Sequence, residues 1–436
     1  MYVLYSALLA AGLLLSLPYW LVQGLLHGKY RAGLRERLGR VPSRLITRTA
    51  RPTIWVHAVS VGEVMAVSAL VTELQRRFDG HRVVVSTTTD TGQQLALSRF
   101  GAENVFYFPL DFAFAIRPYL KCLRPELIVI AETEFWPNVL RLAHASGARL
   151  AIVNARISDR SRPGYARLRF LLTRVLQQVD LFLTQTSEDA RRLQEIGAPA
   201  TRVRVSGNLK YDMPASPMPP IVADLRQALQ RTGGGPVIVC GSTVEDEEPL
   251  LLPAFQAVAA SYPRTVMILA PRHPERFNEV ASLIKQSGSP FFRRSQWARD
   301  SVDAITGGVL LIDTIGELAS LYALADIAFV GGSLVPRGGH NILEAAQHGV
   351  AIVVGEHTEN FREIVELFRS RDAVRVVSPK ELSPVFLELL SHPEERAALG
   401  RHAAEALRSQ TGATQRTLEA LEDLIASRIA VSTKAG

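Results

Sequence analysis

The chain is poor in cysteine, and its two cysteines form no recognisable site. Cys122 and Cys240 lie far apart in the sequence, and each has an apolar neighbour. A residue of this kind is ordinarily a buried free thiol, and a disulfide scaffold needs more cysteines than two. Neither cysteine has the spacing of a zinc ligand to a histidine or to another cysteine. We therefore expect two free thiols, which fits a reducing compartment.

The signature motifs of several common enzyme classes are absent as well. No G-x-G-x-x-G follows the first predicted strand, which disfavours a dinucleotide-dependent dehydrogenase. The chain has no G-x-x-x-x-G-K-[ST] motif of a P-loop ATPase and no G-x-S-x-G motif of a serine hydrolase. No D-x-D pair lies at the end of a predicted strand, so nothing requires Mg²⁺ to bind a nucleotide-sugar diphosphate.

Charge is missing from the first 26 residues, which contain no Asp, Glu, Lys or Arg. A bilayer core is spanned by about 20 apolar residues, so this stretch is long enough to cross a membrane. A cleaved signal peptide would carry positive charge before the apolar stretch, and here none precedes it. Pro18 and Trp20 leave open an anchor that lies in the membrane interface instead of spanning it. A buried hydrophobic helix is the structural alternative.

Basic residues follow this stretch and outnumber the single acidic residue, Glu36, between positions 29 and 51. They are Lys29, Arg31, Arg35, Arg37, Arg40, Arg44, Arg48 and Arg51. By the positive-inside rule, this excess places the bulk of the protein in the cytoplasm. Beside an anchor, the basic segment should also attract anionic lipid headgroups.

The overall composition favours a globular protein of more than one domain. Apolar residues make up 47% of the chain and charged residues 21%, as is typical of folded proteins. A length of 436 residues is too great for one compact core and suits two domains. The formal net charge of +7 indicates anionic partners, which by charge alone include nucleic acid, an acidic membrane surface and phosphorylated substrates.

Short apolar runs alternate with helix-like segments along the rest of the chain. Continuous Val, Ile and Leu runs separated by helices predict parallel sheets that are covered on both faces. We expect strands at residues 53–56, 83–85, 127–130, 150–153, 181–183, 237–240, 266–269, 309–312, 327–330, 351–354 and 374–377. The predicted fold class is α/β, with two doubly wound, Rossmann-like domains that face a central cleft.

A proline-rich stretch separates the two series of strands. Residues 212–220 contain four prolines in nine positions, and such a stretch continues neither a helix nor a central strand. We therefore predict an anchor over residues 1–28, a first domain over 29–211, a linker over 212–220 and a second domain over 221–436.

Polar clusters follow the predicted strands, where ligands bind in open α/β sheets. The most distinctive is GGSLVPRGGHNILEAA, residues 331–346. Gly338 and Gly339 allow the backbone to approach a ligand closely, and a helix beginning near Asn341 offers free N–H groups to a phosphate. Glu344 suits ribose hydroxyls. The structural alternative is an Asn341 N-cap with Glu344 as its capping-box partner.

Other candidates occupy equivalent positions after earlier strands. Glu63 is a candidate general base, or else a first-turn residue that interacts favourably with a helix dipole. Glu132 and Glu134 share one loop, and we expect only one of them to face the cleft. Lys210 neutralises developing negative charge or lies on a surface turn. Arg272 suits bidentate binding of a phosphate or carboxylate, or else a surface salt bridge, and His273 beside it is equally well an ordinary loop histidine.

Six segments, in this order, closely resemble the Kdo (3-deoxy-D-manno-octulosonic acid) transferases. They are HAVSVGE, ETEFWPN, NARIS, GNLKYD, APRHPERF and GGSLVPRGGHNILEAA, and the resemblance covers nearly the whole chain, including the N-terminal anchor. It implies the GT-B glycosyltransferase fold. It also implies transfer of Kdo from CMP-Kdo to a phosphorylated lipid A precursor (lipid IVA) in lipopolysaccharide core biosynthesis, at the cytoplasmic face of the inner membrane, with inversion and without a metal.

The resemblance also assigns roles to individual residues. It makes Glu63 the proton acceptor and Glu132 with Lys210 the pair that stabilises the transition state. The residues that it implies for CMP binding are Pro271, Arg272, Ile315, Gly316, Glu317, Asn341, Ile342, Leu343 and Glu344. The implied partners are CMP-Kdo, the lipid acceptor and anionic membrane lipids; neither a cofactor nor a nucleic acid is implied.

Three other functions remain open on the residues alone. Another GT-B enzyme with a different nucleotide sugar would show similar strand-end motifs but would not explain all six segments. A sugar-binding protein of the periplasm would need a cleavable signal. A membrane scaffold would have no use for the glycine-rich segment. Protection against thermal unfolding by CMP distinguishes the donor-binding enzyme from the last two.

Overall fold

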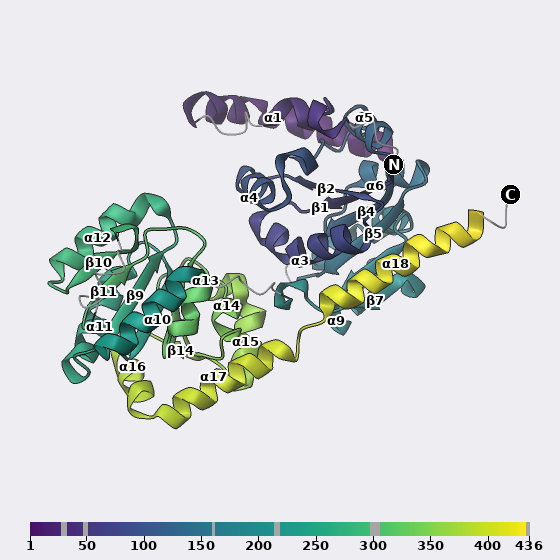
Figure 1. Ribbon diagram of the computed structural model, residues 1–436. Coiled ribbons are helices and arrows are strands. Elements are labelled where there is room, and N and C mark those ends of the chain that lie inside the picture. Colours follow the sequence, from purple (N-terminus) through teal and green to yellow (C-terminus); the bar gives the residue numbers. More distant parts are fainter. Residues whose placement is uncertain (28–32, 47–50, 159–161, 213–218, 297–305, 433–436) are drawn as a thin grey trace. The chain divides into compact units, whose positions relative to one another are not determined.

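The computed structural model describes residues 1–27, 33–46, 51–158, 162–212, 219–296 and 306–432 (Figure 1). The chain forms two compact units, the first from residues 1–213 and 410–436 and the second from residues 214–409. Each unit contains a seven-stranded sheet in which all the strand pairs are parallel. The predicted fold class, two doubly wound α/β domains, is confirmed.

The sheet of the first unit has the strand order β3-β2-β1-β4-β5-β6-β7. Its strands are β1 (Thr53–His57), β2 (Arg82–Thr87), β3 (Val105–Tyr107), β4 (Pro125–Ala131), β5 (Arg149–Ala155), β6 (Leu181–Thr184) and β7 (Val203–Val205). The order along the chain reverses direction between β1 and β4, and such a switch point is where ligands bind in sheets of this kind. The segments that follow β1 and β4 are therefore the first to inspect for a site.

Helices flank this sheet and follow the local signals of the sequence. They are α1 (Tyr2–His27), α2 (Leu34–Arg37), α3 (Val61–Arg77), α4 (Asp90–Phe100), α5 (Ala113–Leu123), α6 (Pro137–Ala145), α7 (Arg162–Arg167), α8 (Arg169–Leu176), α9 (Ser187–Glu195) and α18 (Ala413–Ser432). Thr89 and Thr186 are the N-caps of α4 and α9, where their hydroxyls accept hydrogen bonds from the backbone N–H groups of Gly92 and Asp189.

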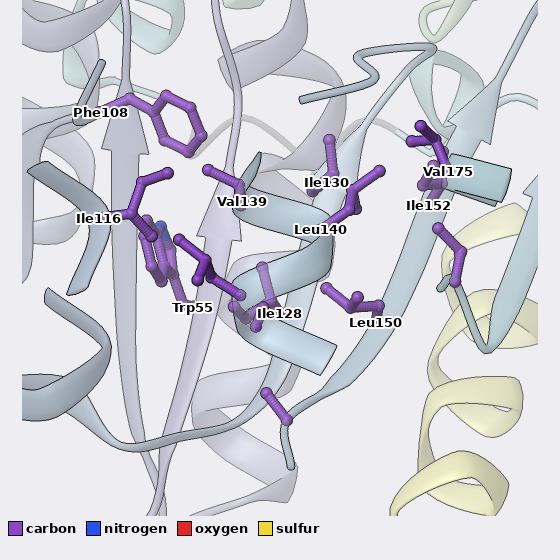
Figure 2. Close-up of a cluster of buried hydrophobic side chains, with 14 of the residues drawn as sticks. Trp55, Phe108, Ile116, Ile128, Ile130, Val139, Leu140, Leu150, Ile152 and Val175 are labelled. Carbon is purple, nitrogen blue, oxygen red and sulfur yellow. The ribbon is translucent and has the colours of Figure 1, made fainter. Parts of the chain in front are cut away.

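The core of the first unit lies on both faces of the sheet, because β1 is buried at all five of its positions. On one face, Val139 and Leu140 of α6 lie over Ile128 and Ile130 of β4 (Figure 2). Burial of such side chains contributes about 1.5–3 kcal/mol for each residue. The second cluster of buried side chains covers the opposite face. The strands that carry the candidate residues are therefore rigidly held.

The last helix of the chain, α18, belongs to the first unit. The sequence analysis had assigned it to the second domain, which was predicted to extend to residue 436. Leu418 and Leu421 of α18 are fully buried in the core of the first unit. The backbone N–H groups of Gly412 and Thr414 donate to the carboxylate of Asp212, and Arg416 donates to the carbonyl oxygen of Ser206. The sequence predicted a helix here, but it did not indicate which of the two units the helix packs against.

The N-terminal helix α1 packs one side against the first unit and exposes leucines on the other. In the part of the chain that the structure describes, no helix is long and apolar enough to cross a membrane, so a membrane-spanning anchor is not confirmed. Most of the predicted linker, residues 213–218, lies outside the described residues. Lys29, Arg31 and Arg48 of the basic segment also lie outside them.

The sheet of the second unit has the order β10-β11-β9-β8-β12-β13-β14. Its strands are β8 (Val237–Thr243), β9 (Val266–Pro271), β10 (Phe291–Arg293), β11 (Val309–Leu311), β12 (Ile327–Val330), β13 (Ala351–Gly355) and β14 (Arg375–Val377). Its helices are α10 (Pro220–Thr232), α11 (Glu248–Ser261), α12 (Phe277–Gln286), α13 (Leu318–Leu321), α14 (Leu343–Ala346), α15 (Arg362–Ser370), α16 (Leu382–Ser391) and α17 (Pro393–Arg408). Both cysteines of the chain are free thiols, as predicted. Cys240 is buried as expected, whereas Cys122 is partly exposed.

Candidate active site

Glu63 lies in the first turn of α3, directly after β1, and is only 7% exposed. Its Oε2 atom accepts a hydrogen bond from the backbone N–H of Val59 at 2.8 Å, and Oε1 accepts one from the hydroxyl of Ser60 at 3.2 Å. Burial raises the pKa of Glu63 to about 7, and the negative charges of Glu132 and Glu134 add to this shift. A carboxylate with a pKa near neutrality is suited to accept a proton at physiological pH.

Glu132 and Lys210 form an ion pair beside this carboxylate. Lys210 Nζ lies 3.3 Å from Glu132 Oε1, and both side chains are partly exposed. Glu132 follows β4 in a left-handed backbone conformation (φ 55°), and its N–H donates to the carbonyl oxygen of Val153 at 2.8 Å. A non-glycine residue held in this conformation is uncommon outside functional sites and turns. The structure therefore brings together three predicted residues from different strand ends.

The turn that carries Lys210 is held by Asn154, a residue of the NARIS segment. The Oδ1 atom of Asn154 accepts a hydrogen bond from the N–H of Leu209 at 3.0 Å. Asn208 caps the same turn by accepting from the N–H of Lys210 at 2.9 Å. Asn154 is fully buried, so its amide oxygen acts as a fixed support for the turn. This role accounts for the asparagine that the sequence motif contains.

Glu134 belongs to the same group of charges, although the sequence predicted that only one carboxylate of its loop would face the site. Both Glu132 and Glu134 raise the pKa of Glu63. The pKa of Glu134 is itself raised, by burial and by the charge of Glu132. Both carboxylates of the loop therefore lie near enough to Glu63 to act on its charge. The expectation that only one of them faces the cleft stays a prediction.

His57, which opens the HAVSVGE segment, is a structural residue. It is completely buried, and its ring stacks on Phe108 with 3.7 Å between the ring centroids. Its Nδ1 atom lies 3.0 Å from Ser86 Oγ and 3.1 Å from the carbonyl oxygen of Ser86. Burial lowers the pKa of His57 to about 3. The imidazole is therefore neutral at physiological pH, and the hydrogen bonds and the stacked ring fix the end of β1.

In the second unit, the glycine-rich segment is fastened by Glu247, a residue that the sequence did not single out. Glu247 is fully buried. Its Oε1 atom accepts hydrogen bonds from the N–H groups of Ser333 and Leu334, both at 2.9 Å. Its Oε2 atom accepts them from Gly332 at 2.7 Å and from Val244 at 3.0 Å. Four backbone donors satisfy one carboxylate, so the segment that follows β12 is held in a single conformation.

Gly338 and Gly339 adopt left-handed conformations, with φ of 87° and 75°. A Cβ atom at Gly338 would lie 2.3 Å from Asn360 Nδ2. The N–H of Gly339 donates to the carbonyl oxygen of Gly332 at 2.7 Å. Glycine is therefore needed at these two positions, while the predicted close approach of a ligand stays a prediction. The cause that the structure shows is the tight fold of the segment on itself and against residue 360.

The helix predicted to begin near Asn341 begins at Leu343. It is α14, a single turn of four residues. Asn341 Oδ1 accepts a hydrogen bond from the N–H of Leu343 at 3.1 Å, which is an asparagine turn. The N-cap residue of α14 is Ile342, so the alternative of an Asn341 N-cap is not what the structure shows. A helix of one turn has only a small macrodipole, so any phosphate binding here depends on individual backbone and side-chain groups.

A second buried carboxylate, Glu248, fixes the segment that contains Pro271 and Arg272. Arg276 donates to both oxygens of Glu248 at 2.9 Å, and the hydroxyl of Thr243 donates to Glu248 Oε1 at 2.8 Å. The N–H of Arg272 donates to the carbonyl oxygen of Thr243, also at 2.8 Å. The backbone at residues 271–276 is thus anchored to the start of α11, while the side chain of Arg272 is exposed.

Arg272, His273 and His340 lie near one another at the carboxyl ends of the central strands β9 and β12. Burial lowers the pKa of His340 to about 4, and the charges of Arg272 and His273 contribute. The Nε2 atom of His340 is buried without a hydrogen-bond partner. The His340 ring also packs closely on Gly332, since a Cβ atom at Gly332 would lie within 3 Å of this ring. The group is suited to hold an anion such as a phosphate.

The segment Ile315–Gly316–Glu317 lies between β11 and α13. Ile315 is 81% exposed, and Gly316 has a φ of 92°. Glu317 pairs with Arg294 through a hydrogen bond of 2.8 Å between Oε1 and Nη2. Its carboxylate is thus already engaged by an arginine. Across the residues that the structure describes, no cluster of three His, Cys, Asp or Glu side chains is arranged to hold a metal ion.

Comparison with known proteins gives a consistent result. Residues 32–213 match a family model described as 3-Deoxy-D-manno-octulosonic-acid transferase (kdotransferase). A 3-deoxy-D-manno-octulosonic acid transferase from Bordetella pertussis is 36% identical over 406 residues, which cover 91% of this chain and 92% of that protein. A protein of the same name from Haemophilus influenzae is 34% identical over 398 residues, with coverages of 90% and 92%.

Among solved structures, that of HepE from Anabaena in complex with UDP resembles this chain in fold. The superposed region covers 86% of this chain and 99% of the HepE chain, with a TM-score of 0.54 and a sequence identity of 13%.

Proposed function

This chain belongs to the family of Kdo transferases, and from that premise we propose that it transfers Kdo from CMP-Kdo to a phosphorylated lipid A precursor, lipid IVA. It is a glycosyltransferase with the GT-B fold, and it serves lipopolysaccharide biosynthesis. The reaction is proposed to invert the configuration at the anomeric carbon and to need no metal. The observation that carries the proposal is the buried carboxylate of Glu63 beside the ion pair of Glu132 and Lys210.

In the proposed reaction, Glu63 accepts the proton of an acceptor hydroxyl. The hydroxyl oxygen then forms a bond to the anomeric carbon of Kdo while the bond from that carbon to the phosphate oxygen of CMP breaks. CMP leaves with the bonding electrons. Lys210 and Glu132, which lie 3.3 Å apart, stabilise the charge that develops, as preorganised groups do most effectively in a partly buried site. A positioned base of this kind contributes a factor on the order of 10²–10⁴ in rate.

The donor is assigned to the second unit. Arg272 binds the phosphate of CMP, with His273 and His340 close by. The backbone at Pro271 and at residues 315–317 and 341–344 supplies further contacts. The buried carboxylates of Glu247 and Glu248 hold these segments before the ligand arrives. Preorganisation of this kind lowers the entropic cost of binding, because these segments need not become ordered when the ligand binds.

We expect CMP to raise the melting temperature of the full chain. At a concentration 100 times the dissociation constant, the stabilisation should be about 2.7 kcal/mol. UMP and UDP in parallel samples test the competing GT-B function with a uridine donor, and Arg272→Ala is the control that removes the cation. Stabilisation by UDP but not by CMP would overturn the assignment of the donor.

The pH dependence of transfer should follow the ionisation of Glu63. Because its pKa is raised to about 7, the carboxylate that accepts the proton is formed only as the pH rises through that value. We expect kcat/KM to fall about thirtyfold between its plateau and pH 5.5. In Glu134→Gln the inflection should move to lower pH, because one of the neighbouring negative charges is removed. A flat profile from pH 5.5 to pH 8 would contradict the role of Glu63.

We also propose that α1 lies in the interface of the inner membrane, with the catalytic units in the cytoplasm. Leu4, Leu8 and Leu15 recur at the spacing of one helix face and are 65%, 65% and 84% exposed. A helix that packs one side on its protein and exposes leucines on the other is suited to insert its outer face below the lipid headgroups. The basic residues between positions 29 and 51 would attract the anionic lipids of that membrane.

The double variant Leu8→Ser/Leu15→Ser should lose binding to vesicles that contain anionic phospholipid. Each leucine buried in the membrane contributes roughly 1.5–3 kcal/mol, so the partition coefficient should fall by at least tenfold. The measurement is cosedimentation with sucrose-loaded vesicles. The control is Ser16→Ala on the same helix, which keeps every exposed leucine. Unchanged cosedimentation of the double variant would show that α1 does not insert.

A further inference from the structure

The inner side of α1 takes part in a buried polar network that leads to the catalytic loop. Tyr5 lies close enough to the buried carboxylate of Asp111 for the charge of that carboxylate to act on its hydroxyl. Burial raises the pKa of Tyr5 above its usual range, so the hydroxyl stays protonated. The next residue, Ser6, accepts a hydrogen bond through Oγ from Asn138 Nδ2 at 3.0 Å. Two consecutive residues of the N-terminal helix thus contact two residues of the first unit.

Asp111 and Asn138 are themselves almost fully buried, at 2% and 1% exposure. The carboxylate of Asp111 accepts hydrogen bonds from the backbone N–H groups of Asn138, at 3.1 Å, and Val139, at 2.8 Å. Its carbonyl oxygen accepts from Asn138 Nδ2 at 2.6 Å. The N-cap of α6 is Trp136, whose side chain makes no capping hydrogen bond. Asp111 therefore supplies the cap that the helix lacks from its own sequence.

The first turn of α6 is also the end of the loop that carries Glu132 and Glu134. This loop joins β4, which ends at Ala131, to α6, which begins at Pro137. Its first residue is fixed by the hydrogen bond from the N–H of Glu132 to Val153. Its other end is fixed by Asp111 and by the contact of Trp136 with Phe108, at 5.4 Å between ring centroids. The position of the carboxylates therefore depends on where α6 starts.

We propose that Tyr5 and Ser6 are positioning residues for the transfer reaction: through Asp111 and Asn138, the N-terminal helix holds the loop that places Glu132 and Glu134 beside Glu63. This inference rests on the proposed function. Helix α1 therefore has two roles. Its outer side exposes leucines, and its inner side contacts the residues that hold the catalytic loop in place. A change in the seating of α1 then changes the rate of the chemical step, although no residue of α1 is assigned to either substrate.

The test compares the double variant Tyr5→Phe/Ser6→Ala with the native full-length chain. Loss of the two hydroxyls removes the hydrogen bond between Ser6 and Asn138 and the polar group of Tyr5 near the Asp111 carboxylate, so that α6 is free to shift. A displacement of about 1 Å at a catalytic group lowers the rate by as much as about 100-fold, so we expect kcat to fall between fivefold and 100-fold. The KM for CMP-Kdo and the protection by CMP should stay unchanged, because the proposed donor residues lie in the second unit.

Two controls separate positioning from general destabilisation. Ser16→Ala removes a hydroxyl whose hydrogen bond, 3.1 Å to Leu13, stays within the helix, and it should leave kcat unchanged. Ser6→Thr keeps the hydroxyl and should restore most of the rate of Ser6→Ala. Hydrogen exchange reports the same change without activity: the amides of Asn138 and Val139 should exchange faster in the double variant.

The outcomes distinguish this inference from the function on which it rests. If the native chain transfers Kdo and the double variant does so with the same kcat and the same exchange rates, the positioning role is wrong and the function stands. If kcat and CMP protection fall together, α1 supports the fold in general, and the specific role is again wrong. If the native chain transfers no Kdo, the proposed function fails and this inference fails with it.

Discussion

Replacement of Glu63 by Gln should abolish transfer while leaving the donor site intact. The variant keeps the size of the side chain and an oxygen that can accept the hydrogen bond from Val59, but an amide cannot take a proton from the acceptor. We expect kcat to fall by a factor on the order of 10²–10⁴, with CMP protection unchanged. A variant that retains transfer would reduce Glu63 to a structural residue at the start of α3.

The same substitution should make the protein more stable at alkaline pH. The pKa of Glu63 is raised from 4.5 to about 7 in the folded state, so folding favours the protonated form. That contribution is fully present below pH 4.5 and is lost as the pH rises through about 7. Above pH 7 the native chain bears a cost of about 3 kcal/mol, which follows from the shift at 1.36 kcal/mol for each pH unit. Glutamine bears no such cost.

Chemical unfolding of both chains at pH 5 and pH 8 measures this difference. The advantage of Glu63→Gln should be small at pH 5 and large at pH 8. Glu73→Gln is the matched control, because Glu73 lies on the same helix but is partly exposed and pairs with Arg76 at the surface. Equal stability of Glu63→Gln and the native chain at pH 8 would show that the carboxylate is better solvated than its burial indicates.

The second large effect is expected when Arg276 is replaced by Met. Glu248 is fully buried and accepts two hydrogen bonds from this guanidinium, and without it only the Thr243 hydroxyl remains. Removal of one partner of a buried ion pair destabilises a protein by about 3–5 kcal/mol. Calorimetry of the full chain should show a lower melting temperature for the second unit, and the affinity for CMP should fall because residues 271–276 are no longer fastened.

Two further variants test whether the isolated charge is the cause. Arg276→Lys keeps a cation near Glu248 but loses the bidentate geometry, so its loss of stability should be smaller. The double variant Glu248→Gln/Arg276→Met removes both charges and should recover much of the stability of the single variant. An Arg276→Met chain as stable as the native protein would show that Glu248 does not depend on this guanidinium for the stability of the second unit.

The central strands of each sheet could be predicted from the sequence, and so could one edge strand, β14, expected at residues 374–377. The other three edge strands could not. Strands β1, β4, β8 and β12 are continuous apolar runs because helices cover both of their faces. Strands β3, β7 and β10 have only three residues each, and so short a run carries no periodic signal. All three were missed. The contact of α18 with the first unit was missed for another reason. An amphipathic pattern shows which face of a helix is buried, but it does not show against which part of the protein that face packs.

The carboxylates that we propose to act in catalysis could be located because they follow strands, a rule that depends only on local order. The supporting carboxylates could not. Glu247 and Glu248 stand in the sequence Glu-Asp-Glu-Glu, which resembles a solvated acidic run. Their partners are the backbone at residues 332–334 and the side chain of Arg276, about 30 to 90 positions further along the chain. Only the folded structure shows that these acids are buried.

Transfer of labelled Kdo from CMP-Kdo to the phosphorylated lipid A precursor by the native chain, assayed with and without a chelator, tests the proposed function most directly. We predict a labelled lipid product whose anomeric configuration is inverted relative to the donor, and the same yield with and without the chelator. A folded native chain that binds CMP yet forms no labelled lipid would contradict the assignment of donor and acceptor.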